Sequence, residues 1–134
     1  MIELKGWNEQ QYKDSVKVPS NAIPYHKSAF VTAVVTATER TLFEEQILTT
    51  VNGLRLAGFV FSSGANHIAA QWRFYRNGNP YDDTLGFLTL GAAVNAVWVP
   101  IYGVWGAGEI LKVSVLNTSG ANKDYAFYTF GWHF

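Results

Sequence analysis

The feature that most constrains the fold is a regular alternation of side chains that ends at a tight turn. Apolar residues stand at every second position from Ile68 to Phe74, and Asn77-Gly78 follows directly. A period of two is typical of a half-buried β-strand, and Asn-Gly is the strongest short-range signal for a two-residue hairpin. This segment therefore predicts an antiparallel strand that turns back on itself.

Strand-like texture continues along most of the chain. Strands are expected at residues 30–38, 41–50, 54–62, 67–75, 84–90, 94–102, 110–117 and 125–134. Residues 41–50 also fit a helical stripe, but their threonines favour a strand with a kink at Glu44-Glu45. Strands spaced by about 8–12 residues, without intervening helices, are typical of antiparallel sandwiches and barrels. Uneven loops favour an all-β, two-sheet antiparallel sandwich of jelly-roll type with about eight strands.

The first part of the chain differs from the rest. Residues 1–24 are polar and mixed in charge, and they end in Pro19 and Pro24, which fix φ and remove backbone donors. We expect an extended N-terminal arm over residues 1–24 and one sandwich domain over residues 25–134. Trp7 and Tyr12 are the expected anchors of the arm on another subunit, because aromatic side chains commonly carry contact energy at interfaces.

The charge content is low for a soluble domain. Charged residues make up 15% of the 134 residues, against roughly 25% in average domains, and ten basic residues balance ten acidic ones. So weakly charged a surface indicates that a partner covers part of it. The scattered Lys and Arg argue against nucleic acid as that partner. We expect no membrane span and no Sec export, because no long apolar run or signal sequence is present.

No arrangement of residues indicates a reaction. His26, His67 and His133 stand apart, without the spacing of metal ligands, and cysteine is absent. The neighbouring carboxylates Glu44-Glu45 and Asp82-Asp83 point to opposite faces if each pair lies in a strand. We therefore expect no catalytic residue, no metal and no cofactor. An enzyme with carboxylates assembled from distant positions is the third-ranked alternative.

Aromatic residues are enriched, and one group of them has a candidate binding role. Trp98, Tyr102 and Trp105 lie within one short segment of a chain that is 16% aromatic. A flat aromatic platform can stack on the apolar face of a sugar. The alternative interpretation, which we favour, is that these rings face the core or a neighbouring subunit.

The other group of aromatics occupies residues 125–134. It places aromatic side chains on both faces of one predicted strand, and such a strand should be covered on both sides. Phe127, Phe130 and Trp132 are therefore expected contacts in an assembly. We expect a closed homo-oligomer, with a slight preference for a trimer.

Three segments carry a resemblance to a known group of proteins. Asn52–Phe59, Trp72–Gly78 and Leu111–Gly120 resemble small jelly-roll virion proteins of tailed bacteriophages, most of all the capsid decoration (cement) proteins. The resemblance covers residues 30–134. It implies a non-enzymatic protein on the capsid surface of a virion, which binds the lattice of the major capsid protein and stabilises it. The alternative is a carbohydrate-binding or receptor-binding module that uses Trp98, Tyr102 and Trp105.

Overall fold

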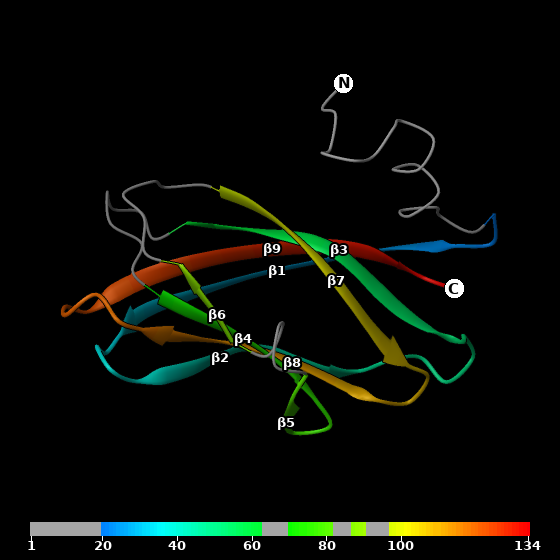
Figure 1. The fold of residues 1–134 in the computed structure, drawn as a ribbon, viewed down its shortest axis with the longest axis horizontal. Helices are drawn as coiled ribbons and strands as arrows, with labels where there is room; N and C mark the ends of the chain where they lie inside the picture. Colours follow the sequence, from blue (N-terminus) through cyan, green and yellow to red (C-terminus); the bar gives the residue numbers. More distant parts are fainter. Residues whose placement is uncertain (1–19, 63–69, 82–86, 91–96) are drawn as a thin grey trace, which may run out of the picture.

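A computed structural model describes residues 20–62, 70–81, 87–90 and 97–134 of the chain. These residues form nine strands in two antiparallel sheets that lie one above the other (Figure 1). The strands are β1 (Ile23–Val34), β2 (Glu39–Gln46), β3 (Gly53–Ser62), β4 (Ala70–Arg76), β5 (Asn79–Pro80), β6 (Phe87–Leu90), β7 (Val97–Gly106), β8 (Ile110–Asn117) and β9 (Lys123–His133).

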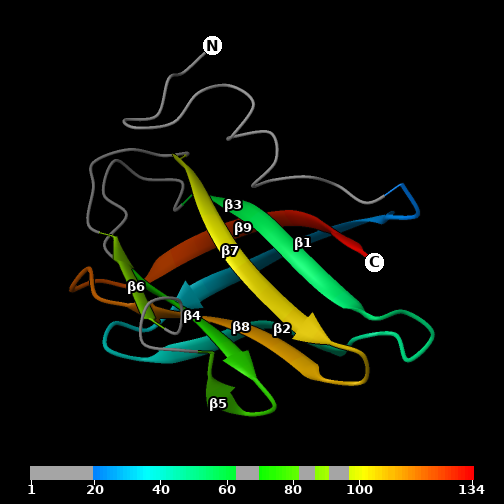
Figure 2. The ribbon, with the colours of Figure 1, turned by 45° about the vertical axis from the view of Figure 1, so that its right-hand side comes forward.

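The pairing of the strands follows a nested order. Sheet A has the order β1-β9-β3-β7, and sheet B has β2-β8-β4, with β5 and β6 both alongside β4. Apart from β5, the first strand pairs with the last, the second with the next to last, and so on inward to β4 and β6. A long hairpin rolled into two layers gives this order, so the predicted jelly-roll sandwich is confirmed. Figure 2 shows the same two layers from a second direction.

The core between the sheets is built mainly from aromatic rings. The ring of Phe127 on β9 stacks on Phe59 of β3 with centroids 5.4 Å apart, and on Trp72 of β4 at 5.7 Å. Phe61 and Phe74 pack against the same group. Offset rings of this kind contribute stability beyond the apolar area that they bury. The alternation that predicted β4 therefore places Trp72 and Phe74 in the core.

A bulge in β3 explains why this segment reads as apolar on both faces. The register of β3 shifts between Leu56 and Gly58 against both of its neighbours, β7 and β9. Such a shift changes which alternate residues point inward. Leu54 and Leu56 before the bulge and Phe59 and Phe61 after it are therefore all buried. The large apolar side chains of β3 therefore fill the core between the two sheets.

Several strand bounds differ from those expected from the sequence, and β1 and β2 both end four residues earlier than predicted. β1 begins at Ile23, which pairs with His133, so the end of the predicted arm belongs to the sandwich. Pro24 fits there because β1 is an edge strand, where a missing N–H can face away from the sheet. In β2 the irregularity lies between Thr41 and Phe43 instead of at Glu44-Glu45. β7 also runs on to Gly106, beyond the predicted end at residue 102.

The predicted hairpin is confirmed. Asn77 and Gly78 have φ angles of 50° and 84°, and they join β4 to β5. Two successive positive φ values match the twist of the flanking strands. The side chain of Asn77 also accepts a hydrogen bond of 2.8 Å from the Ile110 N–H, which fixes the turn against the start of β8.

Candidate functional site

The last strand of the sandwich is apolar on both of its faces. Tyr125 and Phe127 of β9 point into the core and are 0% and 2% exposed. Because side chains alternate along a strand, Tyr128, Phe130 and Trp132 lie on the opposite side, away from sheet B. β9 is a central strand of sheet A, with β1 and β3 as its neighbours.

The register of these neighbours defines the rest of this surface, because directly paired residues share a face of the sheet. Tyr128 pairs with Ser28 and Val60, and Phe130 pairs with His26 and Gly58. Phe30 pairs with Ala126. We call the surface formed by Phe30, Val60, Tyr128, Phe130 and Trp132 the outer face of sheet A.

The outer face of sheet A carries little charge. Over the described parts of the chain its charged residues are Arg55, whose guanidinium lies 5.1 Å from the centre of the Trp132 ring, and Asp124 at the start of β9. Asp124 accepts a 2.7 Å hydrogen bond from the Ala33 N–H. Phe30 is 65% exposed and Tyr128 is 37% exposed. Large exposed aromatic side chains gathered on one face are typical of a surface that meets a partner.

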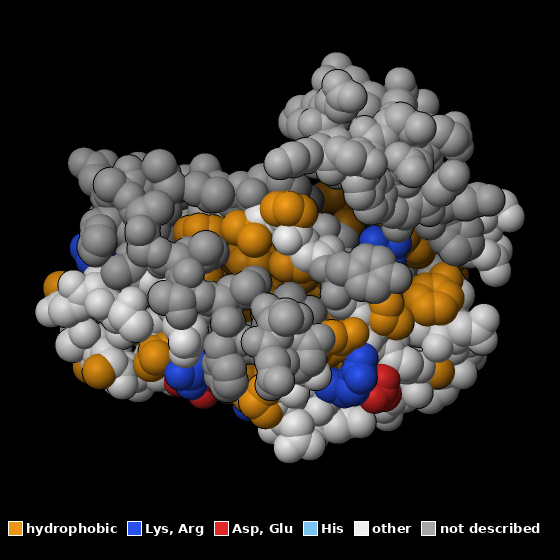
Figure 3. Space-filling model, in the orientation of Figure 1, with side chains coloured by type: hydrophobic (Ala, Val, Ile, Leu, Met, Phe, Trp, Pro, Cys, Tyr) orange, Lys and Arg blue, Asp and Glu red, His pale blue; other side chains and the backbone are white. Residues whose placement is uncertain are grey.

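The outer face of sheet B is different in character. Glu39 accepts hydrogen bonds from the hydroxyls of Tyr75 (2.6 Å) and Ser114 (2.7 Å), and Arg73 lies 3.1 Å from the same carboxylate. Lys112 lies over the ring of Tyr75, 4.3 Å from its centre. In Figure 3 the acidic side chains in view lie in the lower half, over sheet B, while hydrophobic side chains gather near β3 and β7. Ser114 is fully buried and Tyr75 is 9% exposed, so the polar groups of this face are satisfied largely by one another.

The ionisation of Glu39 follows from these contacts. Burial by itself would raise the pKa of the Glu39 carboxyl, but the hydrogen bonds from Tyr75, Ser114 and Arg73 and the charge of Arg73 lower that pKa below its ordinary value. The carboxylate is therefore held ionised and is already bonded on several sides. Such a group is a poor proton donor, and the network around it is best explained as support for the surface of sheet B.

In the described ranges, no group of three or more His, Asp or Glu side chains is placed to hold a metal ion. The same residues contain no helix that is long and apolar enough to cross a membrane.

The structure separates the residues expected to make assembly contacts. Phe130 and Trp132 lie on the outer face of sheet A, and their role in assembly stays a prediction. Trp132 is only 8% exposed, with the Arg55 guanidinium over its ring, so it offers little surface to a partner. Phe127 belongs to the core, so its assignment as an assembly contact is corrected, because its ring has no free surface to offer a partner. Trp7 and Tyr12 lie outside the described residues.

For Trp105 the favoured interpretation, that the ring faces the core, is confirmed. Trp105 is fully buried, its Nε1 donates a 3.0 Å hydrogen bond to the Tyr75 carbonyl oxygen, and its ring packs 4.6 Å from that of Tyr81. It cannot stack on a sugar from this position. Residues 98 and 102 belong to β7, but their side chains lie outside the description.

Sequence reasoning missed three members of the outer face of sheet A, namely Phe30, Val60 and Tyr128. Each lay in a segment predicted to be a strand, but its face depends on pairing between distant segments. For Val60 the bulge in β3 reverses the face that plain alternation indicates. The available signal was the aromatic pattern of residues 125–134, whose two faces were both predicted to be covered.

Comparison with known proteins identifies no family. No protein-family model matches the sequence, and no curated protein matches it. Among solved structures, a chain of infectious bursal disease virus (Gt strain) has a TM-score of 0.46 and 12% identity, and it aligns with 85% of this chain. This protein spans only 34% of that viral chain.

Two further structures concern carbohydrate. A family 35 carbohydrate-binding module from Clostridium thermocellum has a TM-score of 0.42 and 16% identity, with 81% of this chain and 91% of that chain covered. An exo-β-1,3-galactanase from Phanerochaete chrysosporium has a TM-score of 0.38 and 10% identity, with 81% and 27% covered. Likeness at this level assigns no function to the chain.

Proposed function

We propose that this protein is a non-enzymatic structural component of a virion, which binds the assembled capsid and stabilises it as a decoration protein. The observation that carries the proposal is the contrast between the two outer faces. Sheet A presents exposed aromatic side chains with little charge, whereas sheet B presents a network of paired charges. The outer face of sheet A is the surface that docks.

Burial of apolar area supplies the energy of docking. Transfer of apolar surface out of water stabilises a complex by about 25 cal/mol for each Å² removed. Phe30 and Tyr128 are the large side chains on this face with the most surface still to lose. Because few charges lie nearby, long-range electrostatic attraction contributes little to docking. Attachment should therefore persist at high ionic strength.

The resemblance of residues 30–134 to phage decoration proteins suggests which partner this face meets. A protein that binds only the assembled lattice favours that lattice by mass action. Many copies acting together give a large gain without any single strong contact. A closed homo-oligomer, which stays a prediction to be checked by mass in solution, would present several such faces at once.

The test compares capsid shells with and without the protein under heat or osmotic shock. Phe30→Lys is the main variant, because Phe30 is highly exposed and a lysine there should leave the fold intact while it disrupts an apolar contact. The matched control is Thr41→Lys, which places the same charge at an exposed position of β2 in sheet B. We expect bound wild type and Thr41→Lys to protect the shells, and Phe30→Lys to bind weakly and give little protection.

Two results would overturn the proposal. Equal survival of decorated and bare shells would exclude a stabilising role. Release of the protein by salt alone would exclude docking through an apolar face, since only charge–charge contacts are screened in that way.

A further inference from the structure

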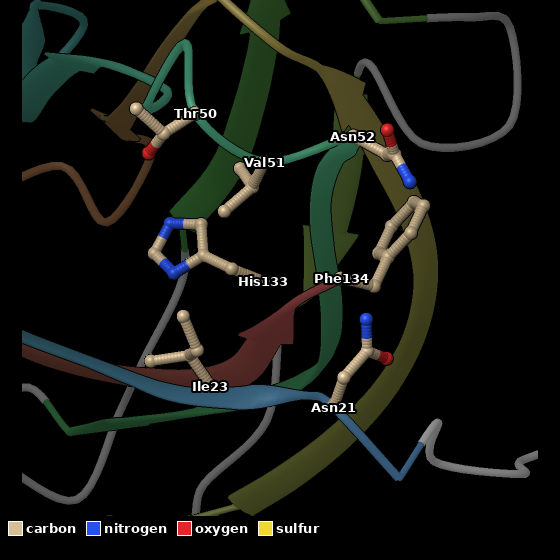
Figure 4. A pocket seen from close by; sticks show the side chains of 7 residues that line it. All are labelled: Asn21, Ile23, Thr50, Val51, Asn52, His133 and Phe134. Carbon is tan, nitrogen blue, oxygen red and sulfur yellow. The ribbon is translucent and has the colours of Figure 1, made fainter.

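A hollow of about 220 Å³ opens at one end of the sandwich, where the start of β1, the loop before β3 and the end of β9 meet (Figure 4). Its lining residues come from three separate parts of the chain. They are Asn21, Ile23, Thr50, Val51, Asn52, His133 and Phe134.

Backbone hydrogen bonds hold the walls of this hollow in place. The N–H groups of Asn52 and Gly53 donate to the carbonyl oxygen of Phe134 at 2.6 and 3.3 Å, and the Phe134 N–H donates to the Gly53 carbonyl oxygen at 3.1 Å. On the other side, Ile23 pairs with His133 in the ladder between β1 and β9. The hollow is therefore framed by sheet A itself, and its shape does not depend on loosely held side chains.

Several polar side chains around the hollow have no hydrogen-bond partner within the described residues. Within the described residues, the side chains of Asn21, Thr50 and Asn52 make no hydrogen bond to the rest of the protein, and the buried Nδ1 of His133 has no partner either. Buried polar atoms are usually bonded, so an unbonded one calls for an explanation. Exposed amide and hydroxyl groups of this kind can exchange hydrogen bonds with a ligand that carries hydroxyl groups.

No side chain of the lining carries a formal charge at neutral pH. The lining contains no Lys, Arg, Asp or Glu. Burial lowers the pKa of His133, so its imidazole is neutral near pH 7 and offers one donor and one acceptor. A phosphate or a carboxylate would find no cationic side chain here. Phe134 adds an aromatic ring, which lies between Asn21 and Asn52 in Figure 4.

We propose that this hollow binds one neutral sugar ring, such as the terminal residue of a glycan. A pyranose offers hydroxyl groups to the amides of Asn21 and Asn52 and to Thr50, and an apolar face of C–H groups to Phe134. The volume is below the range of about 300–1,000 Å³ that is usual for drug-sized ligands, so one ring fits and a longer chain extends into solvent. This site is separate from the docking function proposed above and does not rest on it.

The test is a titration of the full-length protein, observed by ¹H–¹⁵N NMR, with the methyl glycosides of glucose, galactose, mannose and N-acetylglucosamine as probes. Glucuronic acid is the charged comparison. We expect saturable shifts at Asn52, His133 and Phe134 with at least one methyl glycoside, and no saturation with glucuronic acid. An oligosaccharide that ends in the same sugar should bind with similar affinity, because only its terminal ring enters the hollow.

Variants of the lining connect these shifts to the hollow. Thr50→Ala and Asn52→Ala each remove a hydrogen-bonding side chain from an exposed position, and each should weaken binding by about tenfold. Asn122→Ala is the matched control, since Asn122 is exposed next to the other end of β9, and it should leave binding unchanged. Asn21→Ala provides a second test if Asn52→Ala perturbs the fold.

Three results would overturn the inference. The first is no saturable shift with any of the four methyl glycosides. The second is unchanged affinity in the Thr50 and Asn52 variants. The third is binding of glucuronic acid as tight as that of the neutral sugars, which would contradict recognition by uncharged groups.

Discussion

Gly131 stands where β9 passes close beside the bulge of β3. A Cβ atom at this position would lie 1.8 Å from the carbonyl oxygen of Arg55, far inside van der Waals contact. We expect Gly131→Ala to lower the free energy of unfolding by more than about 3 kcal/mol, because backbone atoms on two strands would have to move. Gly120→Ala is the control: it has open space around it and a φ of +85°, so its cost should be nearer 1 kcal/mol. Urea unfolding measures both, and equal losses would contradict the steric argument.

Glu39 predicts a dependence of stability on pH. Its pKa is lowered in the native state, so the unfolded chain takes up a proton more readily. The stability that it contributes is therefore present above its ordinary pKa of 4.5 and is lost as the pH falls through the native value. We expect Glu39→Gln to melt at a lower temperature than wild type at pH 7, and the difference to shrink towards pH 3. Glu44→Gln, on the same strand, is the control. A constant difference across this range would refute the assignment.

At the scale of elements, the bulge in β3 decides which residues fill the core. Ala57 is the extra residue at the bulge, so its deletion restores plain alternation and keeps Phe59 and Phe61 on the core face. We expect this deletion to leave a cooperative thermal transition. Deletion of Val60, beyond the bulge, turns Phe61 to the outer face and should remove that transition. Thermal melts followed by circular dichroism compare the two, and loss of the transition in both variants would contradict this placement of the bulge.

Most elements could be predicted from local pattern, because alternation and turn residues act over a few positions. The hairpin at Asn77-Gly78 and the strands around Trp72 and Phe127 are of this kind. The bulge could not be predicted, since it arises from the fit of β3 against two distant strands. The separation of Trp105 from the other two aromatic residues could have been predicted. Side chains alternate between the two faces of an uninterrupted strand, so residue 105 cannot share a face with residues 98 and 102.

At the scale of the whole molecule, the described core is complete without the first part of the chain. All of its buried apolar residues lie between Val34 and Trp132. We expect deletion of residues 1–19 to leave a cooperative thermal transition, whereas deletion of residues 123–134 should remove it. If deletion of residues 1–19 abolished the thermal transition, the prediction of a separate N-terminal arm would be wrong. Capsid binding by the folded truncation then shows whether Trp7 and Tyr12 contribute to assembly.

The nested order of strands has a consequence for how the protein is made. On the ribosome β1 and β3 emerge early. Their common neighbour β9 is synthesised last among the described strands, so neither can pair with it before then. Sheet A cannot form until residues 123–133 have left the exit tunnel, because β9 lies between β1 and β3. Because such long-range pairing is slow, the incomplete chain exposes its apolar side chains throughout translation. Aggregation is therefore a greater hazard for the nascent chain than for the finished domain, whatever that domain later binds.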